Sequence, residues 1–190
     1  MTMATIWPEL FLTQTGELAE VLSRVDGRSL DALTDTILSA PTILTAGRGR
    51  SGLVMQGFAM RLMHLGKEAH VLGDATTPAA QPNDLMLVGS GSGATSSLVS
   101  AVEQARQFGV RTALVTINPD SSIGRTADLV VRIPAPSPKA DDAESIQSVQ
   151  PMGSLFEQSL GLLLDAVIIR LMGLMNVTAE QMFARHANIE

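Results

Sequence analysis

Residues 42–52 read Thr-Ile-Leu-Thr-Ala-Gly-Arg-Gly-Arg-Ser-Gly, a short apolar and β-branched run that ends in a glycine-rich turn. Residues 53–65 continue with apolar side chains at helical spacing and stop at Gly66. A strand, a glycine turn and a helix in this order are typical of an open α/β sheet. The pattern returns at residues 85–96, where Leu-Met-Leu-Val precedes Gly-Ser-Gly-Ser-Gly-Ala-Thr-Ser.

Short apolar strands are expected along the chain near residues 42–46, 70–72, 85–88, 112–117 and 129–133. They lack the polar and apolar alternation of a half-exposed strand, so both faces of the sheet should be buried. Helical stretches separate these strands, and the last of them is a short one at residues 121–127. This alternation favours right-handed crossovers between parallel strands. The sequence therefore predicts an α/β domain with a five-stranded parallel sheet flanked by helices on both faces, an α/β/α sandwich.

Helices should also flank the sheet at both ends of the chain, over about residues 8–39 and 152–188. Ser29 can cap the second N-terminal helix, and Thr178 with Gln181 has the spacing of a capping box at the start of a terminal helix. We expect one domain over residues 1–190, whose terminal helices pack on the sheet or on neighbouring subunits. The residues between 134 and 145, rich in Pro and acidic side chains, form a linker but introduce no second domain.

The long C-terminal helix, over about residues 152–175, is rich in Leu, Ile and Met but carries charged residues such as Asp165 and Arg170. Because charges are costly at bilayer depth, a buried helix is expected rather than a membrane span. So much apolar surface also predicts a homo-oligomer.

The composition argues against several functions. The 190 residues include 13 Lys+Arg and 19 Asp+Glu, for a net charge of −6, and 3% of residues are aromatic. A nucleic-acid binder would be basic and would offer aromatic stacking surfaces, so no nucleic-acid partner is expected. The absence of Cys excludes disulfides and thiolate chemistry. The first residues show no signal-peptide pattern, so we expect a cytoplasmic protein without a membrane partner.

The second glycine loop suits a phosphate monoester. Its glycines let backbone N–H groups converge, the following helix N-terminus adds partial positive charge, and its hydroxyls can donate to phosphate oxygens. The candidate substrate-binding residues here are Ser90, Gly91, Ser92, Gly93, Thr95 and Ser96. The loop lacks the lysine of a Walker motif, which excludes the usual nucleoside triphosphate chemistry. A capped Gly/Ser turn without a ligand is the alternative.

The first glycine loop admits two interpretations. Gly47, Gly49 and Gly52 match a dinucleotide fingerprint, with Asp74 where a ribose-binding acid would stand. Glycines are also needed in any tight strand-to-helix turn, and Asp74 can be a turn carboxylate.

Side chains of the same loop are also candidates for the ligand site. At least one of Arg48 and Arg50 is expected to face an anionic oxygen of the ligand, such as a phosphate oxygen, and we choose Arg48. Ser51 can add a hydroxyl and a backbone donor at the start of the next helix.

Several separated segments resemble the sugar isomerase (SIS) domain and, within it, the 6-phospho-3-hexuloisomerase family. They are Gly47–Gly52, Phe58–Gly66, Gly89–Gly93 with Thr95, Gln150–Glu157 and Arg185–Glu190. The resemblance spans nearly the whole chain and implies a single SIS-type domain. It also implies interconversion of D-arabino-hex-3-ulose 6-phosphate and fructose 6-phosphate, in formaldehyde fixation through the ribulose monophosphate route. A homotetramer with no metal or redox cofactor is implied too.

The chain departs from the family at Ala94, where many such loops carry an acidic residue. Phosphate binding uses the backbone and neighbouring hydroxyls, so phosphate recognition should persist. Any role of that acid is in doubt.

Moving a carbonyl between adjacent carbons requires a base for the carbon-bound proton and a second group for the oxygen-bound protons. Glu157, in the first turns of the long helix, is our candidate base, and the resemblance points to the same residue. His186 is the candidate acid or shuttle, in its own site or in a neighbour's. A dipole-favoured surface glutamate and an interface histidine are the alternatives.

Two other functions remain open from sequence. A regulatory SIS-type module would sense a sugar phosphate without turning it over, and would need the phosphate loop but no base. An NAD-dependent oxidoreductase would use the fingerprint of the first loop.

Overall fold

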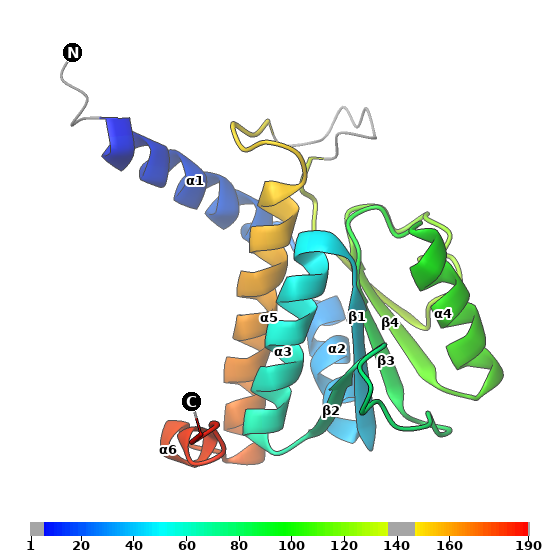
Figure 1. Cartoon of the computed structure of the whole chain (residues 1–190). Helices are drawn as coiled ribbons and strands as arrows, with labels where there is room; N and C mark the ends of the chain where they lie inside the picture. Colours follow the sequence, from blue (N-terminus) through cyan, green and yellow to red (C-terminus); the bar gives the residue numbers. More distant parts are fainter. Residues whose placement is uncertain (1–5, 137–146, 190) are drawn as a thin grey trace.

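The central sheet contains five parallel strands in the order β2-β1-β3-β4-β5 (Figure 1). The computed structural model describes residues 6–136 and 147–189, so most of the predicted linker, and Glu190, lie outside the described residues. The strand bounds are β1 (Thr42–Gly47), β2 (Glu68–Val71), β3 (Leu85–Gly89), β4 (Arg111–Thr116) and β5 (Leu129–Arg132). The predicted parallel sheet is confirmed.

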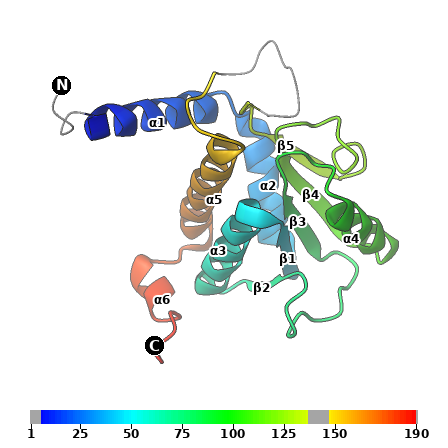
Figure 2. The same cartoon turned by 45° about the horizontal axis from the view of Figure 1, so that its top comes forward.

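The register brings both glycine loops to one edge of the sheet. Gly47 at the end of β1 pairs with Gly89 at the end of β3, and Gly89 pairs with Val115 of β4. In parallel sheets, ligands bind beyond the carboxyl ends of the strands. Figure 2 shows this edge, with the beginnings of α3 (Gly49–Leu65) and α5 (Ser154–Met175) side by side.

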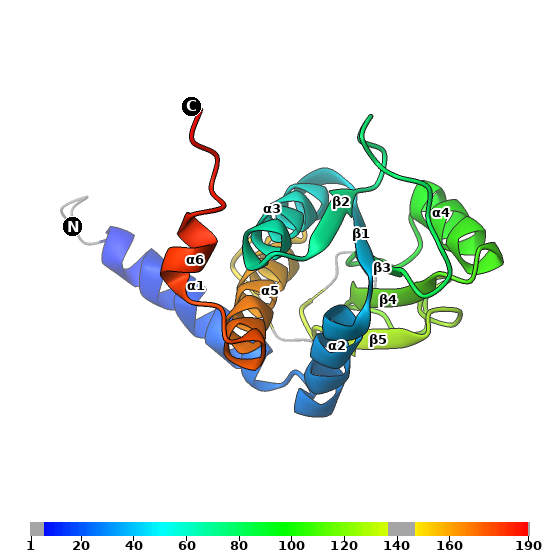
Figure 3. The ribbon, with the colours of Figure 1, turned by 90° about the horizontal axis from the view of Figure 1, so that it is seen from below.

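Helices cover both faces of the sheet, as predicted (Figure 3). Alternate residues of β3 show the division. Leu85 and Leu87 pack in a core shared with α2 (Gly27–Ser39), α3 and α5, whereas Met86 and Val88 pack on the opposite face with α4 (Ser96–Gln107). Residues 121–127 complete that second face as turns rather than as the predicted short helix.

The long helix α5 is a core helix. By length and composition it could cross a membrane, but it packs against α1 (Ile6–Ser23), α2 and α3, and its residues from Leu155 to Leu171 supply much of the main core. This agrees with the expectation that charged residues within an apolar stretch indicate a buried helix.

The terminal helices project from this body. The first half of α1 (Ile6–Ser23) extends beyond the sheet, and the short α6 (Ala179–Phe183) lies where α5 ends (Figure 1). The capping box of Thr178 and Gln181 is confirmed. Asp26, rather than the predicted Ser29, caps α2, because its carboxylate accepts hydrogen bonds from the N–H groups of the first turn.

Candidate active site

The loop after β3 folds into a cradle of backbone N–H groups. Two of its carbonyl groups accept hydrogen bonds from other segments of the chain: Ile117 N–H donates to Gly91 O (3.1 Å), and Ile123 N–H donates to Gly93 O (3.0 Å). Within the described residues, no hydrogen bond satisfies the N–H groups of Ser92, Thr95 and Ser96, the last two at the N-terminus of α4. Free N–H groups at a helix N-terminus attract an anion.

The hydroxyls of the cradle divide into two groups. Ser90 is buried, and its Oγ accepts a hydrogen bond from Gly93 N–H (3.2 Å), so it shapes the loop. Ser92 and Ser96 are exposed, and the N-cap Thr95 makes no side-chain capping bond. Ser92 Oγ accepts a hydrogen bond from Ala94 N–H (3.3 Å), and its own O–H remains a donor. These three hydroxyls are therefore placed to meet a ligand.

Gly93 is required by the conformation and the packing of this loop. Its φ is +58°, and a Cβ there would lie 2.0 Å from Ser121 Oγ and 2.7 Å from Ser121 Cβ. Gly49 has the same φ but no atom within 4 Å of an added Cβ.

We expect Gly93→Ala to lower the free energy of unfolding by about 3 kcal/mol, as left-handed strain and overpacking add. Gly49→Ala, which carries only the conformational strain, should cost about 1 kcal/mol. Chemical denaturation of both variants measures the difference, and equal losses would contradict the contact with Ser121.

Both arginines of the first loop flank the cradle, although only Arg48 was chosen from sequence. Arg48 Nε donates to Ser97 Oγ (3.2 Å) at the start of α4. Arg50 turns toward α5, where its Nη1 lies 2.9 Å from Ser154 Oγ and 2.9 Å from Glu157 Oε2. Ser51 is buried on the first turn of α3. Positive charge thus borders the site on both sides.

Glu157 lies in the first turn of α5, directly beside the cradle. Its side chain is 20% exposed. The preceding Phe156 is buried against the loop, since a Cβ on Gly91 would lie 3.2 Å from its ring. The packing of Phe156 therefore brings the first turn of α5, which carries Glu157, against the loop after β3.

The structure separates His186 from Glu157 within one chain. His186 stacks on His64 at the end of α3, with ring centroids 5.4 Å apart, and Arg185 Nη1 donates to His64 O (2.9 Å). Burial, Arg61 and His186 together lower the pKa of His64. Arg50, which contacts Glu157, and His64 are 14 residues apart on α3, a separation of about 21 Å at about 1.5 Å per residue. His186 is therefore not part of its own chain's site.

The sequence interpretation missed two serines that orient the arginines, Ser97 and Ser154. Ser154 stands three residues before Glu157, the spacing of a capping box, but this pattern predicts a helix cap rather than the observed contact with Arg50. The N-cap is in fact Gly153. Ser97 carries no comparable signal.

The fingerprint glycines of the first loop have a structural explanation. A Cβ on Gly47 would lie 2.9 Å from Gly52 Cα, so the strand and helix meet too closely for side chains. Asp74 is exposed in a turn after β2, with its backbone bonded to Val71 and Thr77. The tight turn accounts for the motif without a dinucleotide.

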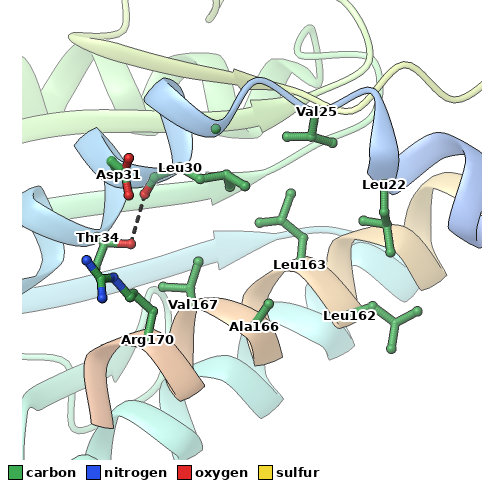
Figure 4. A pocket seen from close by; sticks show the side chains of 11 residues that line it. Leu22, Val25, Leu30, Asp31, Thr34, Leu162, Leu163, Ala166, Val167 and Arg170 are labelled. Carbon is green, nitrogen blue, oxygen red and sulfur yellow. Dashed lines mark hydrogen bonds between the residues drawn. The ribbon is translucent and has the colours of Figure 1, made fainter. Parts of the chain in front are cut away.

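A separate groove of about 390 Å³ lies between α2 and α5 (Figure 4). Leu30 and Thr34 line it from α2, and Leu163, Val167 and Arg170 line it from α5. Its lining includes no residue of either glycine loop.

A parallel sheet whose edge carries a serine-rich anion cradle beside a helix-borne carboxylate defines a phosphosugar-binding α/β domain. The family model of the SIS domain matches residues 36–161, and the chain belongs to this family. The 3-hexulose-6-phosphate isomerase of Bacillus subtilis (strain 168) is 48% identical over 174 residues, which cover 92% of this chain and 94% of that protein. The protein of the same name from Mycobacterium gastri is 46% identical over 92% of this chain and 86% of its own length.

A solved structure supports the same relationship. It is a Methanococcus jannaschii protein for which a molecular function of 3-hexulose-6-phosphate isomerase was inferred. Its TM-score is 0.83 at 30% identity, over 96% of this chain and 99% of that one.

Proposed function

We propose that this chain is a 3-hexulose-6-phosphate isomerase. It interconverts D-arabino-hex-3-ulose 6-phosphate and fructose 6-phosphate in the ribulose monophosphate route of formaldehyde fixation. The observation that carries the proposal is the place of Glu157 beside the cradle, in a chain 48% identical to an isomerase of that name. A phosphate sensor needs the cradle but no base.

In this proposal the loop after β3 holds the phosphate. The N–H groups and hydroxyls of Ser92, Thr95 and Ser96 donate to its oxygens, while Ser90, Gly91 and Gly93 keep the loop in shape. Arg48, held at Ser97, adds charge at the rim. Ser51 is buried in the first turn of α3, directly after Arg50 in the sequence, and we include it among the substrate-binding residues.

Glu157 moves the carbon-bound proton. It takes the proton from C2 of the hexulose, which leaves an enediol across C2 and C3, and it returns the proton to C3 to give fructose 6-phosphate. Arg50, 2.9 Å from the Glu157 carboxylate, is placed to stabilise negative charge on the enediolate oxygens.

His186 moves the proton between O2 and O3 from a neighbouring subunit. Self-association is supported by the exposed apolar side chains of the projecting half of α1, which are Ile6, Trp7, Leu10, Phe11 and Leu12. Such a surface favours an interface between copies, and we propose a homotetramer. We place the enzyme in the cytoplasm.

The test is to mix the purified protein with the hexulose phosphate and to measure fructose 6-phosphate, with no metal or nucleotide added and with EDTA in a parallel sample. Fructose 6-phosphate should appear at the same rate in both. Binding without turnover would instead indicate a sensor, and neither binding nor turnover would reject the proposed function.

A further inference from the structure

The segment before α5 is held by a carboxylate from α1, far away in the sequence. Glu17 Oε2 accepts hydrogen bonds from Ser148 Oγ (2.7 Å) and Gln150 Nε2 (3.0 Å). Its Oε1 accepts one from Val149 N–H (2.8 Å). One carboxylate thus binds three consecutive residues, and we call these contacts the Glu17 clamp.

The Glu17 clamp continues into the helix that carries the base. Gln150 is buried, and its Oε1 accepts a hydrogen bond from Gln158 Nε2 (2.6 Å). Gln158 directly follows Glu157 in α5. A path of side-chain hydrogen bonds therefore runs from α1 through Gln150 to the turn that positions the carboxylate.

The first turn of α5 has little local support of its own. Its N-cap Gly153 has no side chain, and the preceding Met152 is 85% exposed with a φ of +58°. A helix start without a side-chain cap depends on tertiary contacts for its position. The Glu17 clamp supplies such contacts immediately before it.

Glu17 is suited to this task because it is ionised. Burial by itself would raise the pKa of Glu17, but the hydrogen bonds from Val149, Gln150 and Ser148 outweigh it and lower the pKa. An ionised carboxylate accepts stronger hydrogen bonds than a neutral amide, and both of its oxygens only accept.

We propose that Glu17 is a positioning residue for the isomerisation: through Gln150 and Gln158 it sets the place of the Glu157 carboxylate relative to the bound sugar phosphate. This inference rests on the proposed function. Small displacements of a reacting group lower the rate of the chemical step more than the affinity for the ligand.

The test compares Glu17→Gln with Glu20→Gln. Both remove one negative charge from α1, but among the described residues the Glu20 carboxylate contacts only exposed Arg24, one turn away. We expect Glu17→Gln to lower kcat about tenfold with KM within about twofold, and Glu20→Gln to leave both unchanged. Calorimetric titration with fructose 6-phosphate should give an unchanged stoichiometry, which excludes a loss of folded sites.

Hydrogen exchange supplies a readout independent of turnover. The amides of residues 149–157 should exchange faster in Glu17→Gln than in wild type or Glu20→Gln. If the wild type proves inactive, the proposed function fails, and faster exchange in this segment alone still supports the positioning contact. The inference would be overturned if Glu17→Gln showed the same exchange and the same kcat as Glu20→Gln. It would also be overturned if Glu17→Gln exchanged faster in this segment but kept the kcat of an active wild type.

Discussion

Replacing Glu157 by Gln should lower kcat about a thousandfold while fructose 6-phosphate still binds. Gln has the shape of Glu, and its amide oxygen can still accept the hydrogen bond from Arg50 Nη1 now made to Glu157 Oε2 at 2.9 Å. The geometry of the first turn of α5 is therefore kept. What is lost is the ability to take a proton from carbon, the step that the proposed reaction cannot omit.

The measurement combines steady-state kinetics with calorimetric binding of fructose 6-phosphate. Glu103→Gln, at an exposed position of α4, is the matched control for the change in net charge and should retain wild-type kinetics. A variant that turns over normally would reject Glu157 as the base. A variant that neither binds nor turns over, with normal thermal unfolding, would assign the carboxylate to binding instead.

This variant also separates an isomerase from a sensor. If the wild type binds the sugar phosphate but does not turn it over, its function does not require the Glu157 carboxylate. The affinity of Glu157→Gln for fructose 6-phosphate should then equal that of the wild type. The phosphate cradle is the same in both cases, because it is formed by backbone N–H groups and hydroxyls of the loop after β3.

The strands and glycine loops could be predicted from sequence because their signals are local. Buried strands such as residues 85–88 are continuous apolar runs, and the glycines of the loops mark where backbone must turn or approach closely. The choice of Glu157 as the base came from its position in the first turns of the long helix and from the SIS-domain resemblance, and its catalytic role stays a prediction.

Other features depend on contacts between distant segments. The Glu17 clamp joins residues separated by more than half of the chain, and no spacing rule connects Glu17 with Gln150. The capping of α2 by Asp26 was missed because Asp26 and Ser29 are both good caps within one turn. The turns at residues 121–127 keep local bonds such as Arg125 N–H to Ser121 O, but Ile123 N–H bonds instead to Gly93 O of the loop after β3, a contact that no local pattern predicts.

Mixing two inactive variants should restore activity if His186 serves a neighbouring subunit. His186→Ala alone is expected to lose about a hundredfold in kcat, and Glu157→Gln more, since each lacks one proton-transfer group. A pair formed by one chain of each kind contains one site with both groups intact. Random exchange makes half of the pairs mixed, so about a quarter of wild-type sites should return.

The separation of His186 from Glu157 within one chain is the reason to expect a site shared between two chains. Proton transfer needs a group within hydrogen-bond reach of its target. His186 stacks on His64 in the last turns of α3, whereas Glu157 is in the first turn of α5 beside Arg50, at the opposite end of α3. In the fold seen here one chain therefore does not bring both groups to the same substrate, whereas a second copy can supply the histidine.

The control mixes Glu157→Gln with the double variant Glu157→Gln/His186→Ala, which generates no intact site in any pairing and should stay inactive. Absence of recovery in the first mixture, although light scattering shows exchanged oligomers, would place His186 outside a shared site. A monomer at micromolar concentration would reject the shared site outright. Recovery near a quarter would show that the unit of catalysis is a pair of chains.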